Sequence, residues 1–169
     1  FLRFVSVLQP DWFLFENVEG FYRFEKGTIR NKVKHCFEEL GYTVNDAIVI
    51  ASDYGVPQHR NRFIMVGNRN GILFQFPEKH KKVYSVVDAI GDLPELTNGQ
   101  MEDSLPYRCV AKEAGEYAQL MRHGSRTSKQ NYVSRNADYV IERYKYIGQG
   151  KNWKAIPEEL MQNYANKDD

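Results

Sequence analysis

The chain has 169 residues, of which 42% are hydrophobic and 27% charged, and its formal net charge is +1. These values are ordinary for a globular protein. The chain is neither strongly basic nor strongly acidic, so its net charge does not indicate a class of partner. No apolar run is long enough to cross a membrane, and no signal peptide is visible. Cys36 and Cys109 lie far apart, which argues against a disulfide scaffold and favours a reducing, cytoplasmic location.

The first half of the chain carries alternating helix and strand patterns. In chain order they predict the end of a helix at 1–8, a strand buried on both faces at 12–15, a loop at 16–20, a helix at 29–40, and strands at 43–51 and 62–66. Thr28 is the expected N-cap of the longer helix, and Gly41 the glycine that follows its end. Because the chain starts inside a helical pattern, we expect it to be an internal piece of a longer protein.

The connections between the expected strands predict how they pair. The first connection is long enough for a crossover, so the first two strands can be parallel. The second contains Tyr54-Gly55-Val56-Pro57 and is too short for one, so the last two strands should be antiparallel. The sequence therefore predicts an α/β fold whose parallel sheet has an antiparallel strand near its edge.

The second half of the chain has a different character. A short helix is expected at 85–90, and the polar, turn-rich stretch at 97–106 indicates a boundary. From 122 to 154 basic residues outnumber acids and alternate with tyrosines. This stretch is either an ordinary solvated face or a surface that contacts phosphates.

Two short motifs in the first half carry polar side chains next to apolar strands. Glu16 and Asn17 follow the apolar run Trp12–Phe15, and Arg60 and Arg62 lie at the start of the strand expected at 62–66. Residues two apart in an extended chain share a face, and guanidinium groups make planar, bidentate contacts. The acid and the arginines could therefore converge on one planar polar ligand. Each motif also has a plainer interpretation, as a turn with a helix cap and as a charged strand edge.

Taken together, the motifs resemble the C5-cytosine DNA methyltransferase family. Phe13–Gly20 looks like that family's motif VI, and Asp53–Gly67 looks like motif VIII with its following strand. The segment at 86–94 is similar to the one that leads into the family's target-recognition region, and 147–157 is similar to the start of that region. The resemblance covers nearly the whole chain and implies a Rossmann-like, S-adenosylmethionine-dependent methyltransferase sheet followed by a smaller recognition domain.

The resemblance implies roles for individual residues. Glu16 matches the acid that contacts N3 and the amine of a flipped cytosine, and Arg62 the arginine near the cytosine O2. Arg60 matches an arginine that helps to hold the nucleophile loop. Asn17, Val18 and Gln58 match residues that support the base pocket. The recognition region implies lower-ranked DNA contacts at six basic residues: Arg122, Arg126, Lys129, Arg135, Lys151 and Lys154.

Several motifs of the family do not occur in these 169 residues. The glycine-rich cofactor loop and the Pro-Cys nucleophile loop precede motif VI in the family, and neither is present. Cys36 has no proline before it and is expected in the core. The four histidines lack the spacing of metal ligands, so no metal is expected. S-adenosylmethionine is accordingly expected only in the complete enzyme.

These observations predict two parts: the C-terminal half of a catalytic domain at 1–96, and a linker with the start of a target-recognition domain at 97–169. The expected function is DNA (cytosine-5-)-methylation of restriction-modification type, with double-stranded DNA and the remainder of the enzyme as partners. The chain alone is expected to be inactive. The alternative is a non-enzymatic DNA-binding or regulatory subunit of a split methyltransferase. An RNA-methylating relative is disfavoured by the long segment after Pro94.

Overall fold

The computed structural model describes residues 1–161, and the last part of the expected recognition domain, 162–169, lies outside them. The chain forms two compact units. The first comprises Phe1–Gly91 with Gly115–Met121, and the second comprises Asp92–Ala114 with the chain from Arg122 onward.

The first unit contains the predicted helices and strands in the predicted order, together with two helices that were not predicted. Its elements are α1 (Leu2–Leu8), β1 (Trp12–Val18), α2 (Glu19–Arg23), α3 (Thr28–Glu39), β2 (Thr43–Ile50), β3 (Asn61–Asn68), α4 (Val86–Ile90) and most of α5 (Glu116–Arg122). The expected short helix is confirmed as α4, which Ser85 caps by accepting from the backbone N–H of Asp88.

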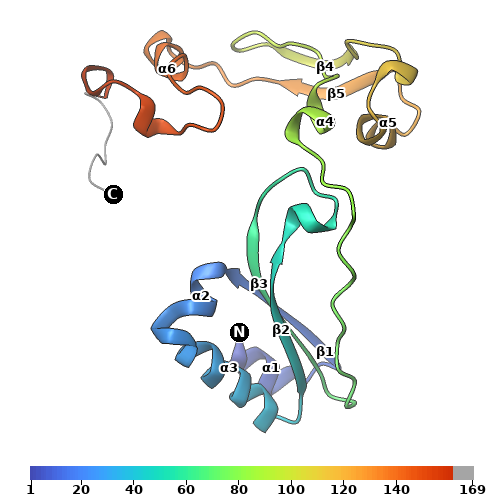
Figure 1. The fold of residues 1–169 in the computed structure, drawn as a ribbon, viewed down its shortest axis with the longest axis vertical. Coiled ribbons are helices and arrows are strands. Elements are labelled where there is room, and N and C mark those ends of the chain that lie inside the picture. The colour runs from blue at the N-terminus through green and yellow to red at the C-terminus, as the bar shows by residue number, and fades with distance from the viewer. Residues whose placement is uncertain (162–169) are drawn as a thin grey trace. The chain divides into compact units, whose positions relative to one another are not determined.

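The strand order of the sheet is β1-β3-β2, and β3 is antiparallel to both neighbours (Figure 1). The expectation of a parallel first pair was therefore wrong. β1 and β2 run in the same direction, but β3 occupies the position between them. The antiparallel strand is central in this sheet and not near its edge. The short β2–β3 connection puts β3 beside β2, and the crossover leaves room for it next to β1.

Pairing with β3 also corrects the boundaries of β1. Every residue from Trp12 to Val18 has a partner on β3, so the strand continues through the segment expected to be a loop, and α2 starts at once at Glu19. Burial on both faces was wrong for the described chain. Phe13 faces the core, whereas the side chain of Leu14 on the other face is 59% exposed.

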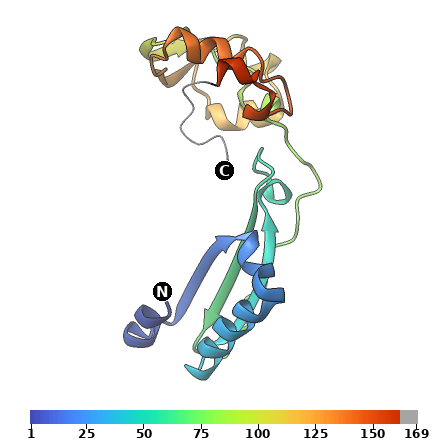
Figure 2. The same cartoon turned by 90° about the vertical axis from the view of Figure 1, so that its left-hand side faces the viewer.

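Aromatic side chains fill the space between the sheet and α3. Phe37 of α3 is fully buried, and its ring centroid lies 4.2 Å from that of Phe13. Phe63 and Met65 of β3 are also fully buried, and Figure 2 shows α3 lying along the sheet. Gly41 adopts a left-handed φ of 86° just after the helix, as predicted, but the N-cap is Gly27 and not Thr28.

The second unit is built on a two-stranded antiparallel sheet. β4 (Met101–Pro106) pairs with β5 (Thr127–Tyr132), and α6 (Asp138–Tyr144) follows. The polar stretch at 97–106 thus contains a strand. Hydrogen bonds from the Asn98 side chain to Asn136 O and from Asn136 N to Asn98 Oδ1, both 2.8 Å, join the two chain segments beside the sheet.

We expect Gly67→Ala to destabilise the first unit. A methyl group at this position of β3 would lie 2.1 Å from a ring carbon of Phe13, so the core must shift. Overpacking of this kind costs about 1–3 kcal/mol, which chemical denaturation can measure. Gly20→Ala is the matched control, since no atom lies within 4 Å of the added carbon. Equal stability of the two variants would contradict this packing.

Candidate functional site

The central position of β3 brings Glu16 and Arg62 together. Val18 and Arg62 are partners in the β1–β3 register, and Glu16 lies two residues before Val18 on the same face of β1. Arg62 Nε lies 2.8 Å from Glu16 Oε1. The side chain of Glu16 is 49% exposed and that of Arg62 is 25% exposed, so the ion pair is reachable from solvent. The structure thus joins the two strongest candidates from the sequence.

Two further atoms of this ion pair remain available to a ligand. Arg62 Nη1 donates to the backbone oxygen of Asn61 at 2.8 Å, which fixes the guanidinium plane. Within the described chain, Arg62 Nη2 and Glu16 Oε2 have no hydrogen-bond partner. A donor and an acceptor held on adjacent groups can bind a planar ligand that has an acceptor and a donor on neighbouring positions.

The other residues of the two motifs differ in their surroundings. Asn17 Oδ1 accepts from the backbone N–H of Val18 at 2.8 Å, which holds the end of β1. Val18 is exposed beside Arg62. Gln58 and Arg60 are exposed in the turn before β3, where Ala51 N donates to Arg60 O. The structure therefore groups Asn17 and Val18 with the ion pair and leaves the side chains of Gln58 and Arg60 in solvent.

Sequence reasoning missed a second bridge between the same strand ends. Asn61 Nδ2 donates to Glu19 Oε2 at 2.8 Å, and Arg23 Nη2 donates to Glu19 Oε1 at 2.6 Å. The hydrogen bond from Asn61 is the main reason why the pKa of Glu19 is lowered, burial opposes this, and Arg23 lowers the pKa further. Val18 and Arg62 are register partners, and Glu19 and Asn61 are their neighbours along the chain. This adjacency was the signal in the sequence for the bridge.

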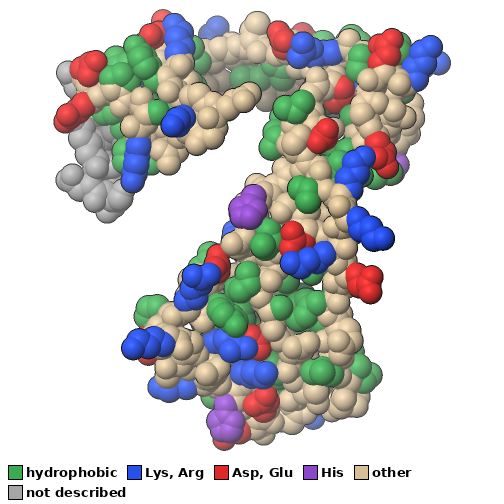
Figure 3. All heavy atoms as spheres, viewed as in Figure 1, with side chains coloured by type: hydrophobic (Ala, Val, Ile, Leu, Met, Phe, Trp, Pro, Cys, Tyr) green, Lys and Arg blue, Asp and Glu red, His purple; other side chains and the backbone are tan. Residues whose placement is uncertain are grey.

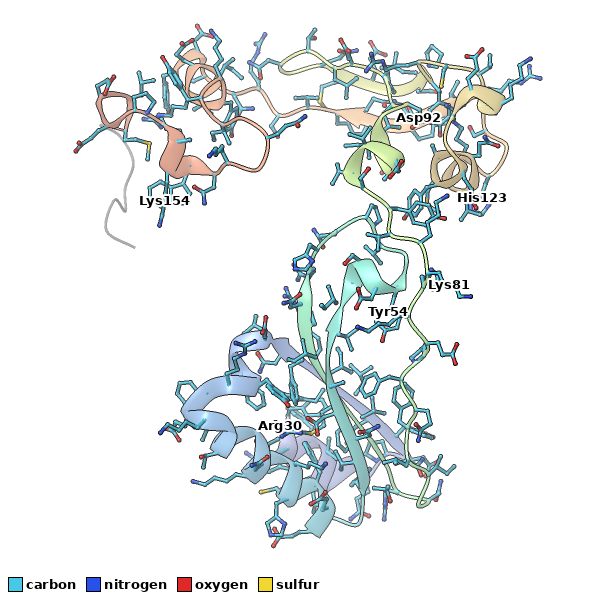
Figure 4. The ribbon with its side chains drawn as sticks, viewed as in Figure 1. Arg30, Tyr54, Lys81, Asp92, His123 and Lys154 are labelled. Atoms are coloured by element: carbon cyan, nitrogen blue, oxygen red, sulfur yellow. The ribbon has the colours of Figure 1, made fainter. Side chains whose placement is uncertain are left out.

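Among the basic candidates of the second unit, Arg122 forms a buried ion pair. Its Nε donates to Asp92 Oδ2 at 2.7 Å, and the two side chains are only 4% and 7% exposed. The guanidinium also lies 4.0 Å from the centre of the Tyr107 ring and donates to Cys109 O. Figure 4 labels Asp92 just after α4. The Arg122 side chain is therefore buried in an ion pair, unlike the other basic candidates of this unit.

The remaining basic candidates are exposed: Arg126, Lys129, Arg135, Lys151 and Lys154. Lys129 Nζ lies 3.6 Å from Asp103 Oδ2, and Lys154 lies 5.8 Å from the Trp153 ring centre. Figure 4 shows Lys154 on the segment that follows α6. On the face seen in Figure 3, Lys and Arg side chains are spread among acids and do not form one block.

Residues 1–161 contain neither a candidate metal cluster nor a candidate membrane-spanning helix. In this part of the chain, no three His, Cys, Asp or Glu side chains are grouped so that they could hold a metal ion. None of the helices described there is long and apolar enough to span a membrane.

Comparison with known proteins gives the class. Residues 1–167 match the family described as C-5 cytosine-specific DNA methylase, and the chain belongs to this family. The type II methyltransferase M1.HphI of Haemophilus parahaemolyticus is 30% identical over 95% of the chain and 37% of its own length. M.DdeI of Desulfomicrobium norvegicum is 28% identical over 96% of the chain and 41% of its own length. The chain thus spans less than half the length of these relatives.

A solved structure supports the fold. It is a prophage-encoded protein of E. coli assigned as a DNA modification methyltransferase, with a TM-score of 0.61 and 24% identity. The match covers 90% of this chain and 50% of that one. The mixed α/β architecture is therefore shared with that protein.

We expect Asn61→Leu to raise the pKa of Glu19, because the variant loses the hydrogen bond that favours the carboxylate. A lowered pKa stabilises the folded state above the unfolded-state pKa, and this stabilisation is lost as the pH falls through the folded-state pKa. The stability gap between wild type and variant should therefore narrow on acidification. NMR titration of the Glu19 carboxyl carbon and denaturation at several pH values measure both effects.

Asn70→Leu is the control, since its exposed side chain has no hydrogen bond to Glu19. A Glu19 titration that is the same in wild type and the Asn61 variant would show that the bridge does not form in solution.

Proposed function

We propose that this chain forms one wall of the cytosine pocket in a DNA (cytosine-5-)-methyltransferase of restriction-modification type. The observation that carries the proposal is the Glu16–Arg62 ion pair at the ends of β1 and β3, with one acceptor and one donor still available. A cytosine presents a carbonyl oxygen, a ring nitrogen and an exocyclic amine along one edge, which complements these groups. Family membership supplies the reaction class.

The target base must leave the DNA stack to reach such a wall. In the proposed complex Glu16 contacts N3 and the exocyclic amine, and Arg62 donates to O2. As negative charge develops on the ring during attack at C6, a carboxyl on N3 and a guanidinium on O2 stabilise it. Val18 packs against the flipped base, and Asn17 holds the strand end from which both Glu16 and Val18 project.

Arg60 and Gln58 are proposed to contact groups other than the flipped base. Both side chains are exposed in the turn before β3, within a few residues of Arg62 along the chain. A guanidinium that is free in solvent can pair with a phosphate or with a backbone oxygen of a neighbouring loop. We assign Arg60, with Gln58 beside it, to contacts with the nucleophile loop and the DNA phosphate.

The described residues do not fit S-adenosylmethionine. A glycine-rich turn between strand and helix would let a backbone approach the cofactor closely. In residues 1–91 β1 instead passes directly into α2 through Val18 and Glu19, and the Glu19 carboxylate is already engaged by Asn61 and Arg23. Cys36 lies within α3 and is no nucleophile in the proposal. The donor that supplies the methyl group is therefore assigned to the remainder of the enzyme.

The open edge of β1 is the proposed contact with that remainder. Among residues 1–161, β1 has a hydrogen-bonded neighbour on one edge only. The outer faces of α1 and β1 expose large apolar side chains, among them Phe4, Val7 and Leu14. An unpaired edge beside apolar surface favours addition of another strand with its own apolar cover. The same surface would serve if the chain is one subunit of a split methyltransferase, which is our alternative proposal.

The second part of the chain, 97–169, is assigned to target recognition in the proposal. Its exposed basic residues Arg126, Lys129, Arg135, Lys151 and Lys154 are proposed to meet the phosphates of double-stranded DNA. Arg122 is left out because its guanidinium is buried against Asp92.

We expect the isolated chain to transfer no methyl group to DNA, because the described wall has neither nucleophile nor donor site. The measurement is incorporation of label from S-adenosylmethionine into mixed-sequence DNA. Addition of a polypeptide that carries the family's cofactor loop and nucleophile should restore incorporation. Turnover by the isolated chain would contradict the proposal.

In the restored enzyme we expect Glu16→Gln to reduce kcat by about 10²–10³-fold, the usual effect of removing one group that stabilises transition-state charge. Single-turnover kinetics separates this effect from DNA binding. Glu78→Gln is the matched control, since Glu78 is an exposed acid of the same unit outside both motifs. If the two variants retain equal kcat, Glu16 has no part in the chemistry.

A further inference from the structure

A hollow beside the β4–β5 sheet combines an aromatic ring, a thioether and a cation. It is lined by six residues: Gly99, Met101, Tyr132, Val133, Ser134 and Arg135. Met101 and Tyr132 are partners in the β4–β5 register and remain 67% and 52% exposed. Exposed large side chains that face each other across a sheet are suited to cover a ligand's apolar part.

The backbone around Arg135 is held on both sides. Val133 N donates to Gln100 O at 2.9 Å before it, and the two hydrogen bonds between Asn98 and Asn136 follow it. Gly99 lies directly under the arginine stem: a carbon added to Gly99 would lie 3.2 Å from Arg135 Cβ and 3.3 Å from Nε. Gly99 thus lets the Arg135 side chain lie across the turn.

The charged end of Arg135 has no ion-pair partner within the described chain. Asp103 of the hollow's own sheet accepts from the Tyr132 hydroxyl at 3.2 Å and lies 3.6 Å from Lys129 Nζ. The hydrogen bond to Asp103 raises the pKa of Tyr132 and ties its hydroxyl to β4. A guanidinium beside an aromatic ring and a thioether can bind an anion that carries an apolar group.

We propose that this hollow binds one nucleotide unit of the DNA backbone, with its phosphate on Arg135 and its sugar against Tyr132 and Met101. The inference rests on the proposed DNA contact of the second unit and makes it specific. Arg135, pre-positioned by Gly99, acts as a single defined phosphate contact, whereas the other exposed lysines and arginines contribute a general field.

The test is fluorescence anisotropy of a labelled mixed-sequence duplex with the full 169-residue chain over a series of KCl concentrations. Loss of one phosphate contact reduces the slope of log K against log salt by about 1. We expect this change for Arg135→Gln, and weaker binding for Gly99→Ala. Gly71→Ala is the matched control, since Gly71 has nearly the same positive φ, 76° against 78°, and no atom within 4 Å of the added carbon.

Circular dichroism and melting temperature check that each variant folds. If Arg135→Gln keeps the wild-type affinity and slope while Arg126→Gln or Lys151→Gln loses affinity, DNA binding stands and the hollow is not its contact. Weakening by Gly71→Ala equal to that by Gly99→Ala would also overturn the role of Gly99. If the wild-type chain binds no DNA even at the lowest salt, the DNA contact and the hollow are both wrong.

Discussion

The hydrogen bonding of β3 to two neighbours is the constraint on which the first unit depends. β3 pairs with β1 over seven residues and with β2 over eight. The pairing buries Phe63 and Met65 under α3, and on the β1 side it sets the register that places Arg62 opposite Val18. One set of backbone contacts therefore fixes both the core and the spacing of the polar pair. A slip by one residue would turn Arg62 toward the other face and separate it from Glu16.

Much of the fold could be predicted because local patterns decide it. The apolar spacing of α3, the glycine after its end and the position of α4 are all read within a few residues of the chain. The strand order could not be predicted in this way, since it depends on which edges remain open after folding. The true end of β1 was missed for a similar reason. Glu16 and Asn17 interrupt the apolar run, and only their partners on β3 keep them in a strand.

The candidate site shows the same division. Glu16 and Arg62 could be named from motifs, and the structure adds that they form an ion pair. The Glu19–Asn61 bridge lies outside the named residues, and its partners are 42 residues apart. Arg122 was counted as surface charge because a sequence window shows no acid beside it. Its partner Asp92 lies 30 residues earlier, and long-range pairs of this kind are invisible to composition.

The buried Arg122–Asp92 pair has a consequence for the construction of hybrid enzymes. Removing either member would leave a charge uncompensated in a dry environment, which usually costs about 3–5 kcal/mol. A second unit transplanted from a relative would keep its integrity only if both positions came from the same parent. A junction between positions 92 and 122 would take the acid from one parent and the arginine from the other. The junction of such a hybrid is therefore best placed before Asp92.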